Sequence, residues 1–146
     1  MRFSFQQARL NPPHYWAYIN IPQQGFTANY DGMVVAVDVE GSSSIFNNSS
    51  HHCVGSISMV AGKGTEKATC KIALADSEDG EFIFFHIDSV FPAPDGIKKG
   101  KFVGGTGKYK NFSGDGITIV KPLPQLASSD PSMRQSVLIL RGSYSY

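Results

Sequence analysis

The sequence has little charge, few cysteines and no long apolar run. Only 17% of its 146 residues are charged, and 13 Lys and Arg against 12 Asp and Glu leave a net charge of +1. A domain that binds nucleic acid through bulk charge needs a basic surface, so this composition excludes that class. Intrinsic disorder is also excluded, because it needs low hydrophobicity, whereas 41% of the residues here are hydrophobic.

The same absences bear on the cellular compartment. No apolar run approaches the roughly 18 residues of a membrane span, and residues 82–85 form the best one. The N-terminal segment lacks the apolar core of a signal peptide. Two cysteines make no disulfide framework, and in a reducing compartment we expect Cys53 and Cys70 to be buried thiols, placed as cross-strand neighbours. We therefore predict a cytoplasmic protein without a membrane span or a nucleic-acid partner.

Clear helical periodicity is nearly absent, and short runs rich in β-branched and aromatic residues predict strands. The expected strands are residues 15–21, 33–39, 52–60, 65–76, 81–90, 100–104, 116–120 and 136–144. A hairpin turn is expected at 61–64, and the Pro-containing segments 91–96 and 122–131 are expected to be loops. About eight strands without crossover helices predict an all-β, antiparallel, eight-stranded up-and-down barrel of the calycin kind. This barrel is expected to be a single domain over residues 1–146.

The densest motif is the glycine-rich segment 102–116. It does not fit a phosphate-binding loop, because Tyr109 follows Gly107 and Lys108 where Ser or Thr is needed. It does not fit a dinucleotide fingerprint, because Lys110 stands where the last glycine belongs. The glycines instead predict a tight kink at the end of a strand, a short turn through 109–112, and a return to the sheet at Gly114.

Three segments resemble the allene oxide cyclase-like barrel superfamily, which includes dirigent proteins. The run 104–109 (Gly-Gly-Thr-Gly-Lys-Tyr) is similar to a Gly-Gly-Ser/Thr-Gly-x-Phe/Tyr segment late in those chains. Residues 18–20 and 26–32 are similar to the Glu-Ile-Asn and the Phe-Thr-Asn…Tyr-Asp-Gly segments of plant allene oxide cyclases. Asn20 matches the Asn that holds a polarising water there, whereas Tyr18 replaces the acidic residue.

The resemblance implies a barrel with a cavity, assembled as a homodimer or homotrimer and acting without a cofactor. It implies a cyclase or isomerase for an apolar small molecule, polyketide- or lipid-derived, as in natural-product biosynthesis. Such an enzyme works by conformer control and hydrogen bonding. The alternative is a non-catalytic, lipocalin-like carrier of a small hydrophobic ligand. A structural module with a filled barrel remains a third interpretation.

Candidate site residues follow from the resemblance and from strand alternation. The catalytic candidates are Asn20, Tyr18 and His86, and the substrate-binding candidates are Trp16, Tyr30, Phe82, Phe84, Asp88 and Tyr109. If Phe82 and Phe84 face inward, His86 and Asp88 share the barrel interior, where Asp88 would orient His86 as a general acid or base. Alternatively, His86 is a satisfied histidine near the barrel mouth. Trp16, Tyr18 and Asn20 share one face, which either lines a pocket or fills the core.

Other chemistries find little support in the sequence. His51 and His52 point to opposite faces of a strand, and without a Cys-x-x-Cys or His-x-His motif we expect no metal site. No nucleophile elbow is present, so hydrolysis by a catalytic triad is not expected. The remaining face of 81–90, with Ile83, Phe85 and Ile87, is apolar and is expected to be covered by a partner subunit.

Overall fold

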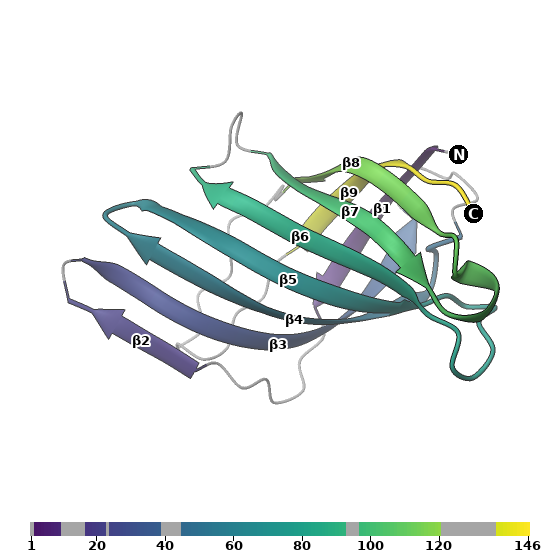
Figure 1. Cartoon of the computed structure of the whole chain (residues 1–146), viewed down its shortest axis with the longest axis horizontal. Coiled ribbons are helices and arrows are strands. Elements are labelled where there is room, and N and C mark those ends of the chain that lie inside the picture. The colour runs from purple at the N-terminus through teal and green to yellow at the C-terminus, as the bar shows by residue number, and fades with distance from the viewer. Residues whose placement is uncertain (1, 10–16, 23, 39–44, 93–96, 121–136) are drawn as a thin grey trace.

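The computed structural model describes residues 2–9, 17–22, 24–38, 45–92, 97–120 and 137–146. They form nine strands and one short 3-10 helix (Figure 1). The elements are β1 (Arg2–Arg9), β2 (Ala17–Ile21), β3 (Gly25–Asp38), β4 (Ser49–Val60), β5 (Lys63–Ala73), β6 (Ile83–Phe91), β7 (Lys98–Gly105), η2 (Gly107–Tyr109), β8 (Ser113–Val120) and β9 (Val137–Ser143). The all-β, antiparallel expectation is confirmed, but nine strands replace the expected eight.

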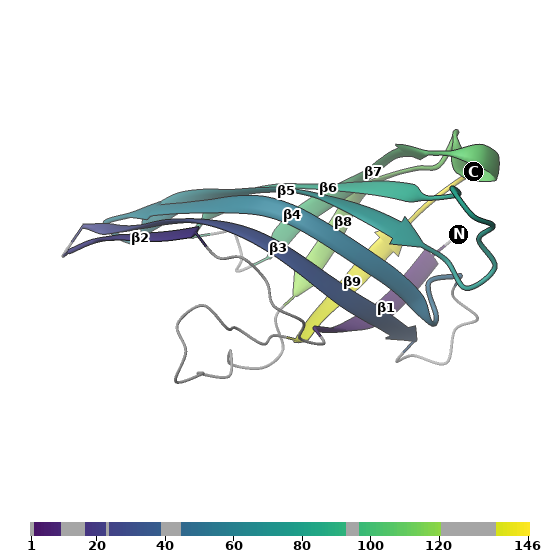
Figure 2. The same cartoon turned by 90° about the horizontal axis from the view of Figure 1, so that it is seen from below.

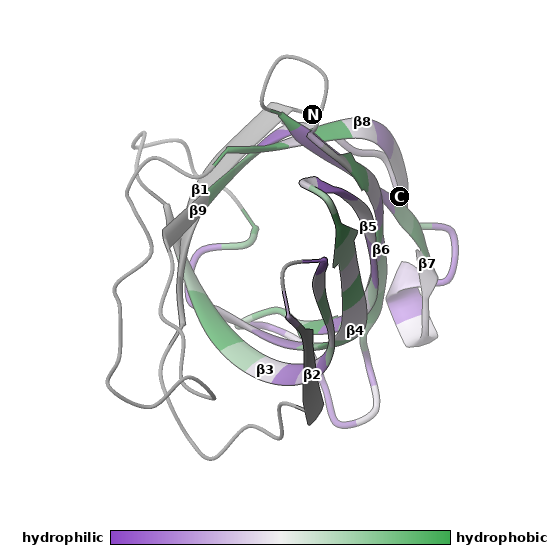
Figure 3. Ribbon diagram, turned by 90° about the vertical axis from the view of Figure 1, so that its left-hand side faces the viewer, coloured by the Kyte–Doolittle hydropathy of each residue, from purple (hydrophilic) through white to green (hydrophobic). Residues whose placement is uncertain are grey.

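The strands form one up-and-down sheet in which β2 to β9 are neighbours in chain order. Strand β1 follows β9 in the order of the sheet and pairs with it. It also pairs with residues 34–38 of β3. The first residues of β3, 25–29, pair instead with β2. Figures 2 and 3 show the sheet curling toward itself, so that it has a concave inner face and a convex outer face.

Two strands differ from the sequence expectation. The segment Arg2–Arg9 forms β1 although its polar residues gave no strand signal. Strand β3 begins at Gly25 rather than Met33, because polar residues at 27, 29 and 31 hide an alternation in which Ala28 and Tyr30 are buried. Only one face of this stretch is apolar, as expected of a strand with one face toward solvent.

Alternation along β5 and β6 places the core on the inner face. In β5, Ala68, Cys70 and Ile72 are buried while the intervening residues are exposed. In β6, Ile83 and Phe85 are buried and belong to the same hydrophobic core, against which Ile87 packs. The prediction that this face of β6 is covered by a partner subunit is therefore wrong, because it packs inside its own chain.

Cys53 and Cys70 lie directly opposite each other on β4 and β5, which confirms that they are cross-strand neighbours. They form a disulfide, with Cα atoms 4.0 Å apart, on the inner face. The expectation of two separate thiols is therefore wrong. Disulfides persist mainly in oxidising compartments. The bond therefore does not support the predicted cytoplasmic location, which stays a prediction.

The glycine-rich segment forms the turn that its sequence predicts. Strand β7 ends at Gly105, η2 follows, and β8 begins at Ser113. A methyl group on Gly105 would lie 2.2 Å from the carbonyl oxygen of Phe82, so only glycine allows this approach. The Thr106 hydroxyl donates to the carbonyl oxygen of Gly80 at 2.6 Å. The motif thus fastens the turn to the loop between β5 and β6.

Aromatic side chains pack at this end of the sheet, which we call the aromatic end. They are Phe46, Phe102, Tyr109, Phe112, Tyr144 and Tyr146. Phe112 stacks on Tyr144 with ring centroids 5.0 Å apart and meets Phe102 edge-on at 5.1 Å. The opposite end, where β2–β3 and β4–β5 turn, is called the hairpin end (Figure 1).

Candidate functional site

Three polar side chains meet on the inner face of the sheet. The Tyr30 hydroxyl donates to Glu66 Oε1 at 2.8 Å, and the Lys98 ammonium forms an ion pair with Glu66 Oε2. The side chain of Glu66 is only 6% exposed, and that of Lys98 is 27% exposed. A carboxylate buried among apolar groups is tolerated only when it is paired and hydrogen-bonded. We call this group the Tyr30–Glu66–Lys98 cluster.

Strand register brings the cluster together from β3, β5 and β7. Tyr30 lies opposite Gly55 on β4, and Gly55 lies opposite Ala68 on β5. A methyl group on Gly55 would lie 2.6 Å from Tyr30 Cζ and 2.6 Å from Ala68 Cβ. The absence of a side chain at Gly55 therefore lets the Tyr30 ring cross β4 and reach Glu66.

Burial of the inner face decreases from the aromatic end to the hairpin end. In β4, Ser49 and His51 are buried, whereas Ile57 and Met59 are half-buried. In β6, Ile87 is half-buried between Phe85 and Ser89, which are buried. The inner face is therefore more accessible toward the hairpin end along β4, around Ile57 and Met59. Apolar walls with a few converging polar groups are typical of small-molecule sites.

Replacing Gly55 by alanine tests the positioning of Tyr30. The new methyl group would collide with the Tyr30 ring, so we expect a loss of about 1–2 kcal/mol in the free energy of unfolding, typical of overpacking. Urea denaturation measures this loss. The matched control is Gly32→Ala, because no described atom lies within 4 Å of that methyl group. Equal stability of both variants would contradict the packing argument.

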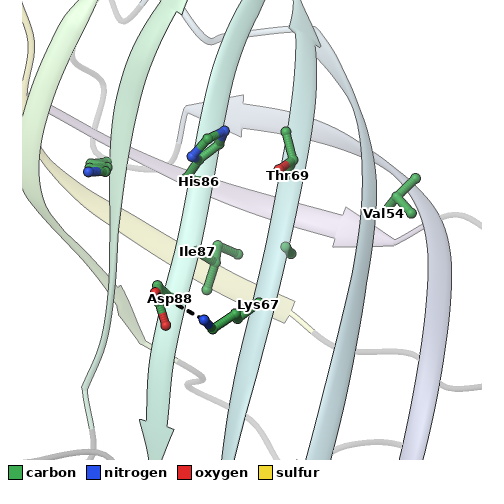
Figure 4. Close-up of a pocket in the computed structure, with 8 residues that line it drawn as sticks. Val54, Lys67, Thr69, His86, Ile87 and Asp88 are labelled. Atoms are coloured by element: carbon green, nitrogen blue, oxygen red, sulfur yellow. Dashed lines mark ion pairs between the residues drawn. The ribbon is translucent and has the colours of Figure 1, made fainter.

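His86 and Asp88 lie on the outer face, and the prediction that they share the barrel interior is wrong. Both side chains are exposed, whereas Phe85 and Ser89 of the same strand are buried. In Figure 4 Asp88 lies beside Lys67 of β5, with which it forms an ion pair at 3.9 Å, and His86 lies across from Thr69 of β5. Both faces of β6 begin with aromatic or aliphatic residues, so the sequence pattern did not distinguish inside from outside.

Phe82 and Phe84 are also not interior residues. Phe84, on the same side of β6 as His86, is half-buried. Phe82 precedes β6, is half-buried, and has the Lys71 ammonium 3.5 Å above its ring centroid. Lys71 belongs to the exposed positions of β5. The predicted inward aromatic wall on this strand is therefore replaced by Ile83, Phe85 and Ile87.

The other predicted residues are distributed over both ends of the sheet. Tyr30 is 4% exposed and belongs to the cluster, whereas Tyr109 is 2% exposed and packs in the aromatic end. The Tyr109 hydroxyl donates to Asp76 Oδ1 at 3.1 Å. Tyr18 and Asn20 pair with Ala28 and Phe26 through the β2–β3 ladder. Their side chains, and all of Trp16, lie outside the described part of the chain.

His51 and His52 point to opposite faces, as predicted. His52 Nε2 contacts Asp31 Oδ1 at 2.5 Å on the exposed outer face. His51 is 1% exposed, and its Nε2 lies 2.8 Å from Ser49 Oγ. Ser49 donates its one hydroxyl hydrogen to the carbonyl oxygen of Phe46 at 2.6 Å, so His51 must donate from Nε2. Because Ser49 is committed to that carbonyl, this pair is not an activated nucleophile.

Burial lowers the pKa of His51 from 6.5 to about 3. The ring is therefore neutral at physiological pH. In the described ranges, no three His, Cys, Asp or Glu side chains are placed to hold a metal ion. The same part of the chain contains no helix that is long and apolar enough to cross a membrane.

Sequence reasoning missed Glu66 and Lys98. The signal was present for Glu66, because it occupies the same alternating positions of β5 as Ala68, Cys70 and Ile72. A charge in the register of an apolar face indicates either an error in the strand assignment or a buried functional group. Lys98 gave no such signal, because a lysine follows it and Gly100, not an apolar side chain, is its neighbour on the inner face.

Comparisons with known proteins show a fold and no family. No protein-family model matches the sequence, and no curated protein matches it. Among solved structures, pyocyanin demethylase superposes on this chain with a TM-score of 0.50 and 14% sequence identity. The superposition covers 99% of this chain and 100% of that chain. The chain therefore has an antiparallel β fold like that of pyocyanin demethylase.

Proposed function

We propose that the chain is a cyclase or isomerase that takes an apolar small molecule into the inner face of its curled sheet. The observation that carries the proposal is the buried Tyr30–Glu66–Lys98 cluster beside half-buried apolar residues. Buried ionisable groups that are held beside specific charge partners cluster at functional sites. The resemblance to allene oxide cyclase-like proteins and the shared fold with an enzyme named for a small molecule, pyocyanin, also support it.

In this proposal the sheet acts as a closed barrel. The pairings of β1 with both β9 and β3 support a ring of eight strands, with β2 added to the hairpin half of β3. A ring of about eight strands can hold one small ligand. The ligand would enter at the hairpin end, against Ile57 and Ile87, and reach the cluster.

Each member of the cluster has a role in the proposed reaction. Glu66 accepts a proton from one carbon of the substrate and returns it to another, so that the atoms balance within one molecule. The Lys98 ammonium, which has three N–H donors, donates a hydrogen bond to an oxygen on which negative charge develops. The Tyr30 hydroxyl keeps donating to Glu66 Oε1 and so positions that carboxylate. Ile57, Met59 and Ile87 restrict the substrate to one conformer. Hydrogen-bonded groups in a site with little water act more strongly than they do in solvent.

A retention-time assay tests the proposal. Isomerisation and most cyclisations leave the mass of a compound unchanged but move its chromatographic retention. We incubate the purified protein with the small-molecule extract of its source cells and compare mass spectra before and after. The wild type is expected to convert one apolar compound at constant mass. Glu66→Gln is expected to slow this conversion about 100-fold or more, within the range of acid–base catalysis.

Asp88→Asn is the matched control, because Asp88 lies on the outer face, and it should leave the rate unchanged. Native mass spectrometry of the same sample reports bound compounds and the number of subunits. A compound that copurifies but is never converted would favour the alternative, a non-catalytic carrier, over an enzyme. A conversion that changes the mass, or one that Glu66→Gln leaves intact, would overturn the proposed reaction.

A further inference from the structure

The outer face of β4 to β7 carries most of its charge with one sign. The exposed positions of these strands hold five lysines, which are Lys63, Lys67, Lys71, Lys99 and Lys101. The same positions hold one carboxylate, Asp88. Because the whole chain has a net charge of only +1, this face is locally much more positive than the molecule. A positive face concentrates anionic partners.

A depression of about 360 Å³ lies within this face. Figure 4 shows that its residues come from neighbouring strands. Thr69 on β5, His86 on β6 and Lys101 on β7 lie directly opposite one another across the ladder. Lys67 and Asp88 form the next row, and Val54 of β4 adds an apolar margin. The size of the depression is within the range of small-molecule sites.

Two of these side chains have donors that the described protein does not use. Lys67 pairs with Asp88 at 3.9 Å, and Lys71 lies over the Phe82 ring. By contrast, neither Lys101 nor His86 makes a hydrogen bond or ion pair with another described side chain. Lys101 and His86 lie directly opposite each other on neighbouring strands. An anion placed between them would accept from both.

We propose that this depression binds an oxyanion, a phosphate or a carboxylate, carried by a small molecule with a compact apolar part. Lys101 and His86 donate to the anion, the Thr69 hydroxyl adds a third donor, and Val54 contacts the apolar part. This site is separate from the Tyr30–Glu66–Lys98 cluster, because alternate residues of β5 and β6 point to opposite faces. It does not depend on the proposed catalytic function.

NMR titration tests the site. The imidazole signals of His86 and the amide signals of Thr69 and Lys101 are followed while inorganic phosphate, and then phenyl phosphate, replaces chloride at constant ionic strength. We expect saturable shifts at these residues, with phenyl phosphate binding more tightly because of Val54. Lys101→Gln is expected to weaken binding about three- to tenfold, as for loss of one charged donor near the surface.

Lys110→Gln is the matched control. Lys110 is exposed and follows η2, so this substitution removes the same charge away from the depression. Equal weakening by both variants, or shifts that follow ionic strength alone, would overturn the site. Sedimentation with phosphatidylglycerol vesicles distinguishes a lipid surface from a free ligand. Lys101-dependent binding to vesicles without binding of phenyl phosphate would overturn the small-molecule assignment.

Discussion

Replacing Glu66 by alanine is expected to lower the free energy of unfolding by about 3 kcal/mol, since it breaks a buried pair. The substitution removes the acceptor of the Tyr30 hydroxyl and the opposite charge beside the Lys98 ammonium. Fully buried pairs lose about 3–5 kcal/mol when one partner is removed. The expected value lies at the low end because Lys98 is 27% exposed. Chemical denaturation of the purified chain measures it.

A double-mutant cycle separates the pair from the effect of packing. Lys98→Ala leaves the carboxylate of Glu66 on the inner face without that ammonium, so it is also destabilising. The double variant should be more stable than the sum of the two losses predicts, by about 1–3 kcal/mol. Asp88→Ala breaks an exposed pair between β5 and β6, with the charged atoms 3.9 Å apart, and should change stability little. Additive losses would show that Glu66 and Lys98 do not stabilise each other.

Acid is expected to destabilise the fold through His51. Its pKa is about 3 in the folded protein because the ring is buried, against 6.5 without burial. Between these values the unfolded chain binds a proton that the folded chain does not, so stability falls as the pH falls through this window. The loss is expected to be about 2 kcal/mol between pH 7 and pH 5, and about 4 kcal/mol once the pH reaches 3. Below that pH it levels off, because His51 then binds a proton in the folded protein as well.

His51→Gln identifies the residue responsible. Glutamine does not titrate, and its amide can donate to Ser49 Oγ in place of the ring Nε2. The pH range from 7 to 5 avoids the protonation of Glu81, whose pKa is lowered by hydrogen bonds from the backbone N–H groups of Glu78 and Lys108. Thermal unfolding of both proteins at each pH measures the slopes. The same slope in the variant would place the acid sensitivity elsewhere.

Much of the candidate site was not predictable from the sequence. Tyr30 was identified only through a resemblance of residues 26–32 to plant allene oxide cyclases. His86 and Asp88 were assigned to the interior because both faces of β6 contain apolar residues, and alternation alone does not say which face is covered. Glu66 and Lys98 stand 32 residues apart in the chain. Their pairing depends on the order of β5, β6 and β7 in the sheet, which no local pattern encodes.

By itself the sequence determined the all-β class, most of the strands, their antiparallel up-and-down order and the glycine turn before β8. These features arise from interactions between near neighbours: alternation with period two, turn residues, and glycines that permit a close approach. The tertiary structure decided the rest. It selected the inner face of β6, joined Cys53 to Cys70, and brought Tyr30, on β3, to Glu66 over a separation of 36 residues. Such contacts depend on how the whole sheet curls, because only that curl determines which side chains are removed from water.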